Sequence, residues 1–114
     1  MREKEYILLG GKLFTETELL RKGYIFSVVR FKDREYPTMC RRIGSYCIHF
    51  CPRYSVPFEQ LRVFLTDVQG KVTFEKHPLF CSEDDIALFL VQTKKKRKDK
   101  KARDKKGVGV RKLL

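Results

Sequence analysis

The positive charge of this 114-residue chain is concentrated in one segment. Residues 94–114 contain twelve Lys and Arg side chains against Asp99 and Asp104, a net charge of +10 out of the chain's total of +12. A lysine-rich stretch with so few apolar side chains cannot bury enough surface to form a core. The sequence therefore predicts two parts: a compact body over residues 1–93 and a Lys/Arg-rich tail over residues 94–114. The tail is expected to be disordered or helical.

The body is nearly neutral and rich in apolar side chains. It contains fourteen basic and twelve acidic residues, together with all 9 Phe and all 5 Tyr of the chain. About ninety residues of this composition suffice for one domain. Residues 1–5 are charged and lack the apolar core of a signal peptide, and no apolar run approaches the ~20 residues of a membrane span. We therefore expect a soluble, non-secreted protein with no membrane partner.

Patterns of β-branched and aromatic residues predict that the body is mainly β. Such side chains favour a pleated surface, and Gly70 suits the tight turn of a hairpin. Strands are expected over residues 6–9, 24–31, 43–51, 61–66 and 71–74. We expect an α+β fold, a small curled sheet or barrel of four to five strands, since closure hides sheet edges.

Two short helices are expected beside the strands. Thr15 and Glu18 have the spacing of a capping box, which marks the start of a helix. Ser82 and Asp85 repeat this spacing before an apolar run at residues 86–91. Acidic residues at that position favour a helix N-terminus. We expect a helix there, with a final strand as the alternative.

The tail begins with a run of cations that resembles the lysine-rich monopartite nuclear localisation signal. The run consists of Lys94, Lys95, Lys96, Arg97 and Lys98. This resemblance implies recognition by an importin-α-type carrier, whose groove would take the extended peptide. It implies that the protein enters the nucleus, the nucleolus included.

The tail continues beyond the length that import requires. The further cations are Lys100, Lys101, Arg103, Lys105 and Lys106. Extended basic tracts bind nucleic-acid phosphates by releasing counterions, with little sequence preference. Lysine outnumbers arginine nine to three in the tail, which favours point-charge phosphate contacts over bidentate base contacts. A solvated tail without a specific partner is the alternative.

The body offers a second candidate surface for nucleic acid. Its candidate residues are Arg30, Arg34, Arg41, Arg42, Arg53 and Tyr54. Interleaved cations and aromatic rings are typical of proteins that stack unpaired bases. The alternative is that the aromatic residues fill the core and that nearby acids, Asp33 and Glu35, balance the arginines.

Four cysteines and two histidines raise the question of zinc. These residues are Cys40, Cys47, Cys51, Cys81, His49 and His77. A zinc site needs four ligands in a tetrahedron, and the spacings here do not form a standard pair of zinc knuckles. On one strand, Cys47 and Cys51 would lie ~13 Å apart. We expect buried, reduced thiols, no metal, no cofactor and no catalytic residues, so the protein is not expected to be an enzyme.

Together these patterns predict a small nuclear protein associated with nucleic acid, RNA being favoured over DNA. The tail would bind phosphates, and the body would contact RNA, DNA or a ribonucleoprotein complex. The main alternative is a non-enzymatic protein-interaction subunit of a larger nuclear complex, whose tail serves only in import. A virus-encoded accessory protein is a third alternative.

Overall fold

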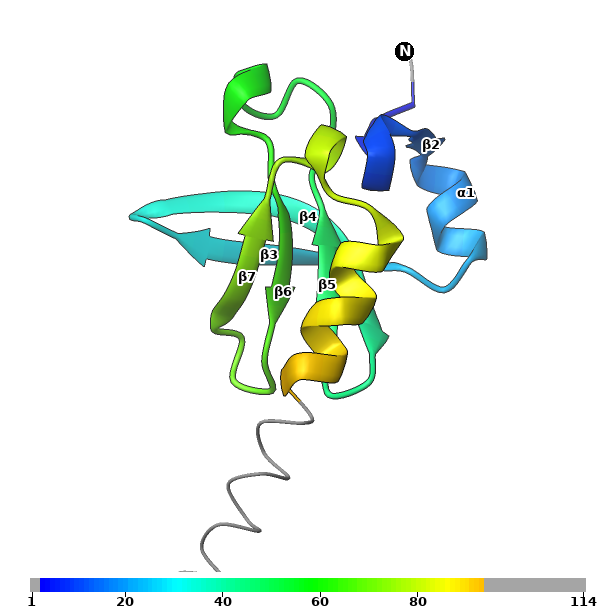
Figure 1. The fold of residues 1–114 in the computed structure, drawn as a ribbon. Coiled ribbons are helices and arrows are strands. Elements are labelled where there is room, and N and C mark those ends of the chain that lie inside the picture. Colours follow the sequence, from blue (N-terminus) through cyan, green and yellow to red (C-terminus); the bar gives the residue numbers. More distant parts are fainter. Residues whose placement is uncertain (1–2, 94–114) are drawn as a thin grey trace, which may run out of the picture. The chain divides into compact units, whose positions relative to one another are not determined.

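The computed structural model of the chain describes residues 3–93. The chain divides into two units, Met1–Ser82 and Glu83–Leu114, which we describe separately. In its described part the first unit contains seven strands in two sheets (Figure 1). The protein is mainly β with two α-helices, as the sequence predicts in outline.

The larger sheet has five antiparallel strands in the order β3-β4-β5-β6-β7. Their bounds are Ile25–Phe31, Arg34–Ile43, Tyr46–Phe50, Val63–Thr66 and Val72–Lys76. Of the two forms expected from the sequence, a curled sheet or a barrel, the barrel is wrong, because β3 and β7 remain two edges and form no ladder with each other. The expected number of strands is also too small, since β4 and the short β2 went unrecognised.

The smaller sheet pairs β1 (Glu5–Ile7) with β2 (Leu13–Thr15). A 3-10 turn, η1 (Leu9–Gly11), joins them, so the strand expected over residues 6–9 ends early. The outer edge of β1 bonds to the segment that follows β5. The amide of Ile7 donates to the carbonyl of Cys51 at 3.2 Å, and the amide of Arg53 donates to the carbonyl of Glu5 at 2.7 Å.

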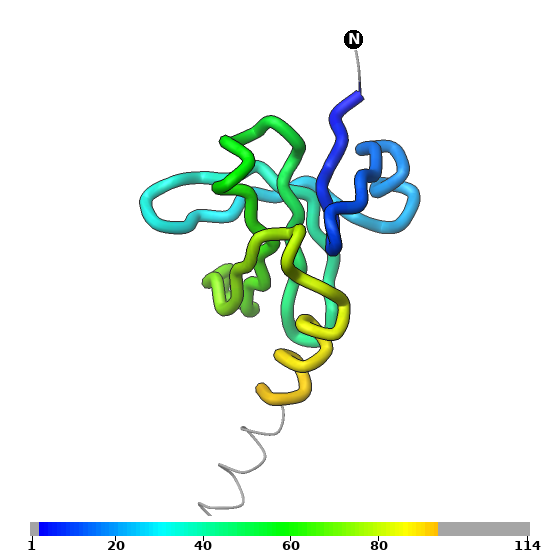
Figure 2. The backbone as a smooth tube through the Cα atoms, turned by 45° about the horizontal axis from the view of Figure 1, so that its top comes forward, coloured from blue at the N-terminus to red at the C-terminus, as the bar shows by residue number. Residues whose placement is uncertain are grey.

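The β3–β4 hairpin turns on two residues with positive φ. Lys32 and Asp33 have φ values of 49° and 60°, the left-handed pair of a type I′ turn. Only the Met39–Ile43 part of β4 pairs with β5. The turn end of the hairpin therefore projects past the other strands, as Figures 1 and 2 show.

The expected single strand over residues 43–51 is wrong. A two-residue turn at Gly44 and Ser45 divides this segment between β4 and β5, and Gly44 supplies the positive φ of 64°. Within β5, Ile48 pairs with Leu65 and His49 pairs with Phe64 of β6. Both faces of β5 are buried except at Cys47, which is half-buried.

The expected hairpin formed by β6 and β7 is confirmed. The Asp67 carboxylate accepts from the amides of Gln69 and Lys71, both at 2.9 Å, and Gly70 has the positive φ of 81° that the turn needs. The strand β6 begins at Val63 rather than Leu61, because a 3-10 turn, η2 (Phe58–Gln60), precedes it.

Both expected helices are present. In α1 (Glu16–Arg21), the Glu18 amide donates to the Thr15 hydroxyl at 3.1 Å, and the Thr15 amide donates to the Glu18 carboxylate at 2.8 Å. This reciprocal pair is the expected capping box. The second helix spans residues 83–93 of the second unit, so the alternative of a final strand is wrong. Its continuation into the tail lies outside the described residues.

One core cluster lies on the face of the large sheet that carries Val29, Tyr36 and Phe64. Its further buried members are Ile7, Cys51 and Leu61. The rings of Tyr36 and Phe64 meet edge to face, with centroids 5.1 Å apart. This cluster ties β1 and the segment before β6 to the sheet, which fixes the position of the loops at that end.

Candidate functional site

An apolar pocket lies where these loops meet. Its volume is about 290 Å³. The floor includes Ile7 and Leu61, which are also part of the core cluster. The remaining lining residues are Gly11, Leu13, Arg53, Tyr54, Val56, Phe58 and Leu79. Apart from Arg53 and Tyr54 the lining side chains are hydrocarbon, as is usual in sites that take a flat or apolar group.

Tyr54 presents its ring beside this pocket in a strained backbone conformation. The residue is 84% exposed, and its φ of 68° lies in the left-handed region. For a residue with a side chain this conformation costs about 1–2 kcal/mol. Such strained residues concentrate at binding sites, where the surrounding structure holds them in place.

Arg53 and its neighbours hold the tyrosine in this position. The guanidinium of Arg53 lies 4.9 Å from the centroid of the Tyr54 ring and donates to the Glu5 carboxylate at 2.8 Å. The Ser55 hydroxyl donates to the carbonyl of Pro52 at 2.6 Å, which closes the turn. The loop is therefore anchored to β1 on one side and to its own backbone on the other.

Exposed aromatic and aliphatic side chains surround the pocket. Phe58 is 54% exposed and Phe80 is 71% exposed, and His77 lies between them, with centroids 4.9 Å from Phe58 and 5.6 Å from Phe80. Leu13 and Leu79 are each 45% exposed. We call Leu13, Tyr54, Phe58, Leu79 and Phe80 the aromatic rim. An exposed apolar patch beside a pocket marks an interaction site on a protein surface.

The imidazole of His77 connects two of the turns that carry the aromatic rim. His77 accepts a hydrogen bond from the amide of Leu79 at Nδ1, at 3.1 Å, and its Nε2 lies 3.0 Å from the carbonyl of Phe58. The histidine thereby ties η2 to η3 (Pro78–Phe80). Gly11 sits against the same turn, so close that a Cβ there would lie 2.4 Å from Cδ2 of Leu79.

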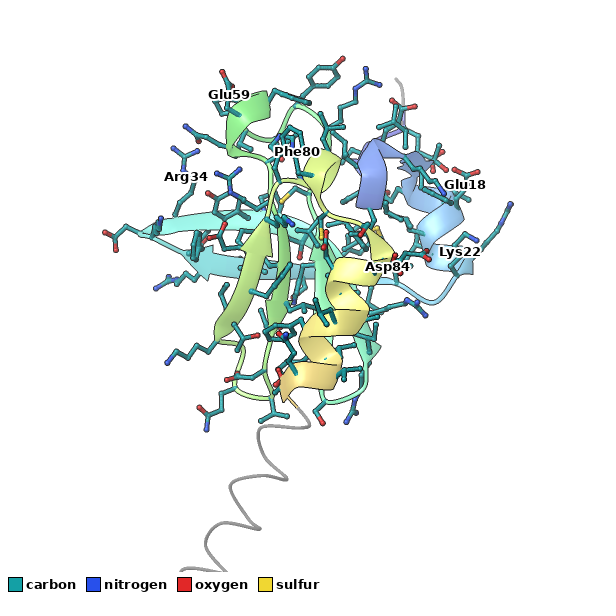
Figure 3. All side chains as sticks on the ribbon, viewed as in Figure 1. Glu18, Lys22, Arg34, Glu59, Phe80 and Asp84 are labelled. Atoms are coloured by element: carbon teal, nitrogen blue, oxygen red, sulfur yellow. The ribbon has the colours of Figure 1, made fainter. Side chains whose placement is uncertain are left out.

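The structure brings some of the predicted basic residues to the rim. Arg53 lines the pocket, and Arg34 donates to the Gln60 side chain at 2.7 Å, at the end of η2. Figure 3 shows Arg34, Glu59 and Phe80 at the same end of the first unit. Of the predicted residues, Arg53 and Tyr54 therefore lie together at the pocket, and Arg34 contacts the end of η2.

The other predicted residues of the body lie elsewhere. Arg30 pairs with Glu35 at 2.9 Å on the hairpin. Arg41 stacks over the Tyr24 ring at 5.6 Å, and Arg42 donates to the carbonyl of Gly44 at the opposite end of β5 from Arg53. The single basic face expected from the sequence is thus divided. The predicted tail residues, from Lys94 to Lys106, lie outside the described residues.

The buried histidine of the large sheet is part of a polar bridge in the core. His49 is 4% exposed, with Nδ1 3.0 Å from the Thr38 hydroxyl and Nε2 2.9 Å from the Thr66 hydroxyl. Burial lowers its pKa to about 4, so the ring is neutral near pH 7. It links β4, β5 and β6 and has both ring nitrogens occupied.

The cysteines do not gather into a metal site in the described part of the chain. Within residues 3–93, no group of three or more His, Cys, Asp or Glu side chains is placed to hold an ion. Burial raises the pKa of Cys51 to about 11 and also raises the pKa of Cys40. Thiols in such an environment stay protonated and react slowly as nucleophiles.

The sequence analysis missed most of the rim. Phe58 and Leu79 each follow a proline and lie outside the strands expected from the sequence. An apolar residue in such a position is the signal in the sequence that could have indicated the rim. The pocket itself joins segments more than sixty residues apart, from Gly11 to Leu79, which periodicity cannot reveal.

Comparisons of the chain with protein-family models, with curated proteins and with solved structures found no match. Among the described helices none has the length and apolar character needed to cross a membrane.

Proposed function

We propose that this protein associates with nucleic acid in the nucleus, and that its aromatic rim binds unpaired RNA bases. The observation that carries this proposal is the ring of Tyr54, 84% exposed, backed by Arg53 and set beside an apolar pocket. Stacking a base on such a ring contributes about 1–3 kcal/mol and tolerates any base, because every base has a π face.

The neighbouring cations support RNA as the ligand. Arg53 lines the pocket and Arg34 contacts the end of η2, where both can meet phosphates near a stacked base. Sequence-specific recognition of RNA uses unstacked bases in loops and ends, and a ring-and-pocket site can take such a base. Duplex DNA keeps its bases stacked and does not offer them to such a site.

The tail has a separate role in the proposal. Its net charge of +10 supports binding to phosphate backbones without sequence preference, at an affinity that falls steeply with salt. Its first five residues, which resemble a nuclear localisation signal, support import by an importin-α-type carrier. The tail thus concentrates the protein on RNA or a ribonucleoprotein, and the rim selects unpaired bases there.

The test is fluorescence anisotropy of the full-length protein against single-stranded RNA, duplex RNA and duplex DNA at several salt concentrations. Replacing Tyr54 by alanine should weaken single-stranded RNA binding by about tenfold, whereas Tyr54→Phe retains the stacking face. Val68→Ala, at an apolar residue 82% exposed in the β6–β7 turn, is the matched control and should leave affinity unchanged. Equal affinities for the three ligands, unaffected by Tyr54→Ala, would contradict the proposal.

One observation favours the second candidate, a non-enzymatic protein-interaction subunit. The pocket is lined almost entirely by hydrocarbon side chains, so it could also bind an apolar side chain of a partner protein. The two candidates predict different effects of rim substitutions on RNA affinity. If tail-dependent RNA binding persists with Tyr54→Ala and with Phe58→Ser, the rim serves a protein partner and the tail serves import.

A further inference from the structure

A second exposed surface lies on the β3–β4 hairpin, away from the aromatic rim. Three apolar residues of β3 are among the most exposed in the body: Ile25 is 62% exposed, Phe26 is 58% exposed and Val28 is 60% exposed. The strand is one edge of the large sheet. An exposed apolar edge strand is a template for pairing with another strand.

The hairpin register determines which backbone groups face outward. Phe31 and Arg34 flank the two-residue turn, so they exchange hydrogen bonds, and such pairs alternate along an antiparallel ladder. The pairs Val28–Pro37, Phe26–Met39 and Arg30–Glu35 therefore fall on non-bonded positions. The N–H and C=O groups of Phe26, Val28 and Arg30 point away from β4, toward the free edge of β3.

The two edges of the projecting hairpin differ in protection. On β4, Pro37 occupies a position whose backbone nitrogen faces outward, and a proline there removes the donor that a new strand would need. On β3, residues 25–29 contain no proline and no charge. The far edge of the sheet, β7, carries Glu75 and Lys76 and contains a register shift in its ladder with β6. Residues 25–29 of the β3 edge thus lack the proline, charge and bulge that block edge pairing elsewhere in the sheet.

We propose that β3 pairs with the β3 strand of a second copy of this chain, antiparallel and centred on Val28. In this register Val28 meets Val28, and Phe26 meets Arg30 of the other copy. Every outward N–H and C=O of Phe26, Val28 and Arg30 then finds a partner, because the outward residues of one strand lie opposite outward residues of the other.

The side chains that this register places opposite each other are compatible. The Arg30 guanidinium would lie across from the Phe26 ring, a favourable cation–π pair, while its ion pair with Glu35 stays intact. No like charges lie directly opposite each other, since the two Arg30 residues are separated along the ladder. The apolar Phe26 and Val28 side chains of both copies become neighbours, which removes exposed apolar surface from water.

The test is the mass of the full-length, nuclease-treated protein by analytical ultracentrifugation, at moderate and high salt because the cationic tails repel. The wild type should form dimers. Val28→Lys should be monomeric at concentrations where the wild type is dimeric, since it sets two lysines opposite each other. Val68→Lys, at a residue 82% exposed in the β6–β7 turn, is the matched control and should dimerise normally.

Variants of opposite charge at residue 28 test whether the two Val28 residues lie opposite each other in the dimer. Val28→Glu alone should also be monomeric, and an equimolar mixture with Val28→Lys should form heterodimers. A variant that had merely unfolded would not recover in this mixture. A monomeric wild type at all concentrations, or a dimer that Val28→Lys leaves intact, would overturn the proposal. The result is independent of RNA binding at the rim, because Tyr54→Ala should dimerise as the wild type does.

Discussion

The guanidinium of Arg53 lies 4.9 Å from the ring centroid of Tyr54, and Glu5 holds the same guanidinium from the other side at 2.8 Å. The loop after β5 is therefore fixed by a contact to β1, although its aromatic ring is almost fully exposed. The ring lies beside an apolar pocket, so the Arg53 contact and the pocket form one continuous surface for a ligand.

The backbone of Tyr54 leads to a first prediction. Its φ of 68° suits asparagine and is unfavourable for a β-branched residue. Tyr54→Asn should therefore be more stable than Tyr54→Val by about 1–2 kcal/mol, while both variants lose RNA affinity. Urea unfolding with anisotropy on the same samples checks this. Equal stability of the two variants would show that the left-handed conformation is not retained.

Gly11 should be required for the packing of the rim. Its φ of 81° and the 2.4 Å approach of a Cβ to Leu79 both oppose a side chain. Gly11→Ala should lower the free energy of unfolding by about 1 kcal/mol or more. Gly10→Ala is the matched control, because Gly10 has a φ of 74° but no atom within 4 Å of its Cβ. If both variants unfold at the same denaturant concentration, Leu79 moves aside without a penalty.

The buried His49 should make stability depend on pH. Its pKa is about 4 in the folded protein and near 6.5 in the unfolded chain, so the unfolded state binds more protons between these values. Stability is fully present above pH 6.5 and should fall by about 3 kcal/mol as the pH drops toward 4. Urea titrations at several pH values measure this fall. His49→Gln should flatten the profile over this window, and an unchanged profile would contradict the role of His49.

Substitutions in the turn of the β3–β4 hairpin should stabilise the folded protein. Lys32 and Asp33 both occupy left-handed positions that favour Asn followed by Gly. The double substitution Lys32→Asn with Asp33→Gly should raise the free energy of unfolding by about 1 kcal/mol. Thermal unfolding measures the change. A loss of stability would mean that the Lys32 ammonium, 5.2 Å from the Phe31 ring centroid, contributes more than the turn geometry.

Local signals in the sequence predicted the elements that depend on local chemistry. The Thr15–Glu18 capping box, the β6–β7 hairpin with Gly70 and the helix after Ser82 all formed where their signals lie. The strand β4 was missed because Pro37 normally argues against a strand. Here proline is tolerated because β5 does not extend along that part of β4.

The candidate site could be predicted only in part. Arg53 and Tyr54 are neighbours in sequence, so their proximity follows from the sequence alone. Phe58, Leu79 and Gly11 join them only through the packing of η1, η2 and η3, which is a tertiary arrangement. Arg41 and Arg42 were grouped with Arg53 because they are close in sequence, yet the length of β5 separates them.

The central claim is that unpaired bases stack at Tyr54. Its most direct test is ¹H–¹⁵N NMR of the full-length protein titrated with a short single-stranded RNA at a salt concentration that weakens binding to the tail. We expect the largest shifts in the described part of the chain at Arg53, Tyr54, Phe58 and Leu79, with little change at Arg41 and Arg42. Shifts confined to the tail, or centred on β4 and the turn at Gly44, would contradict the account.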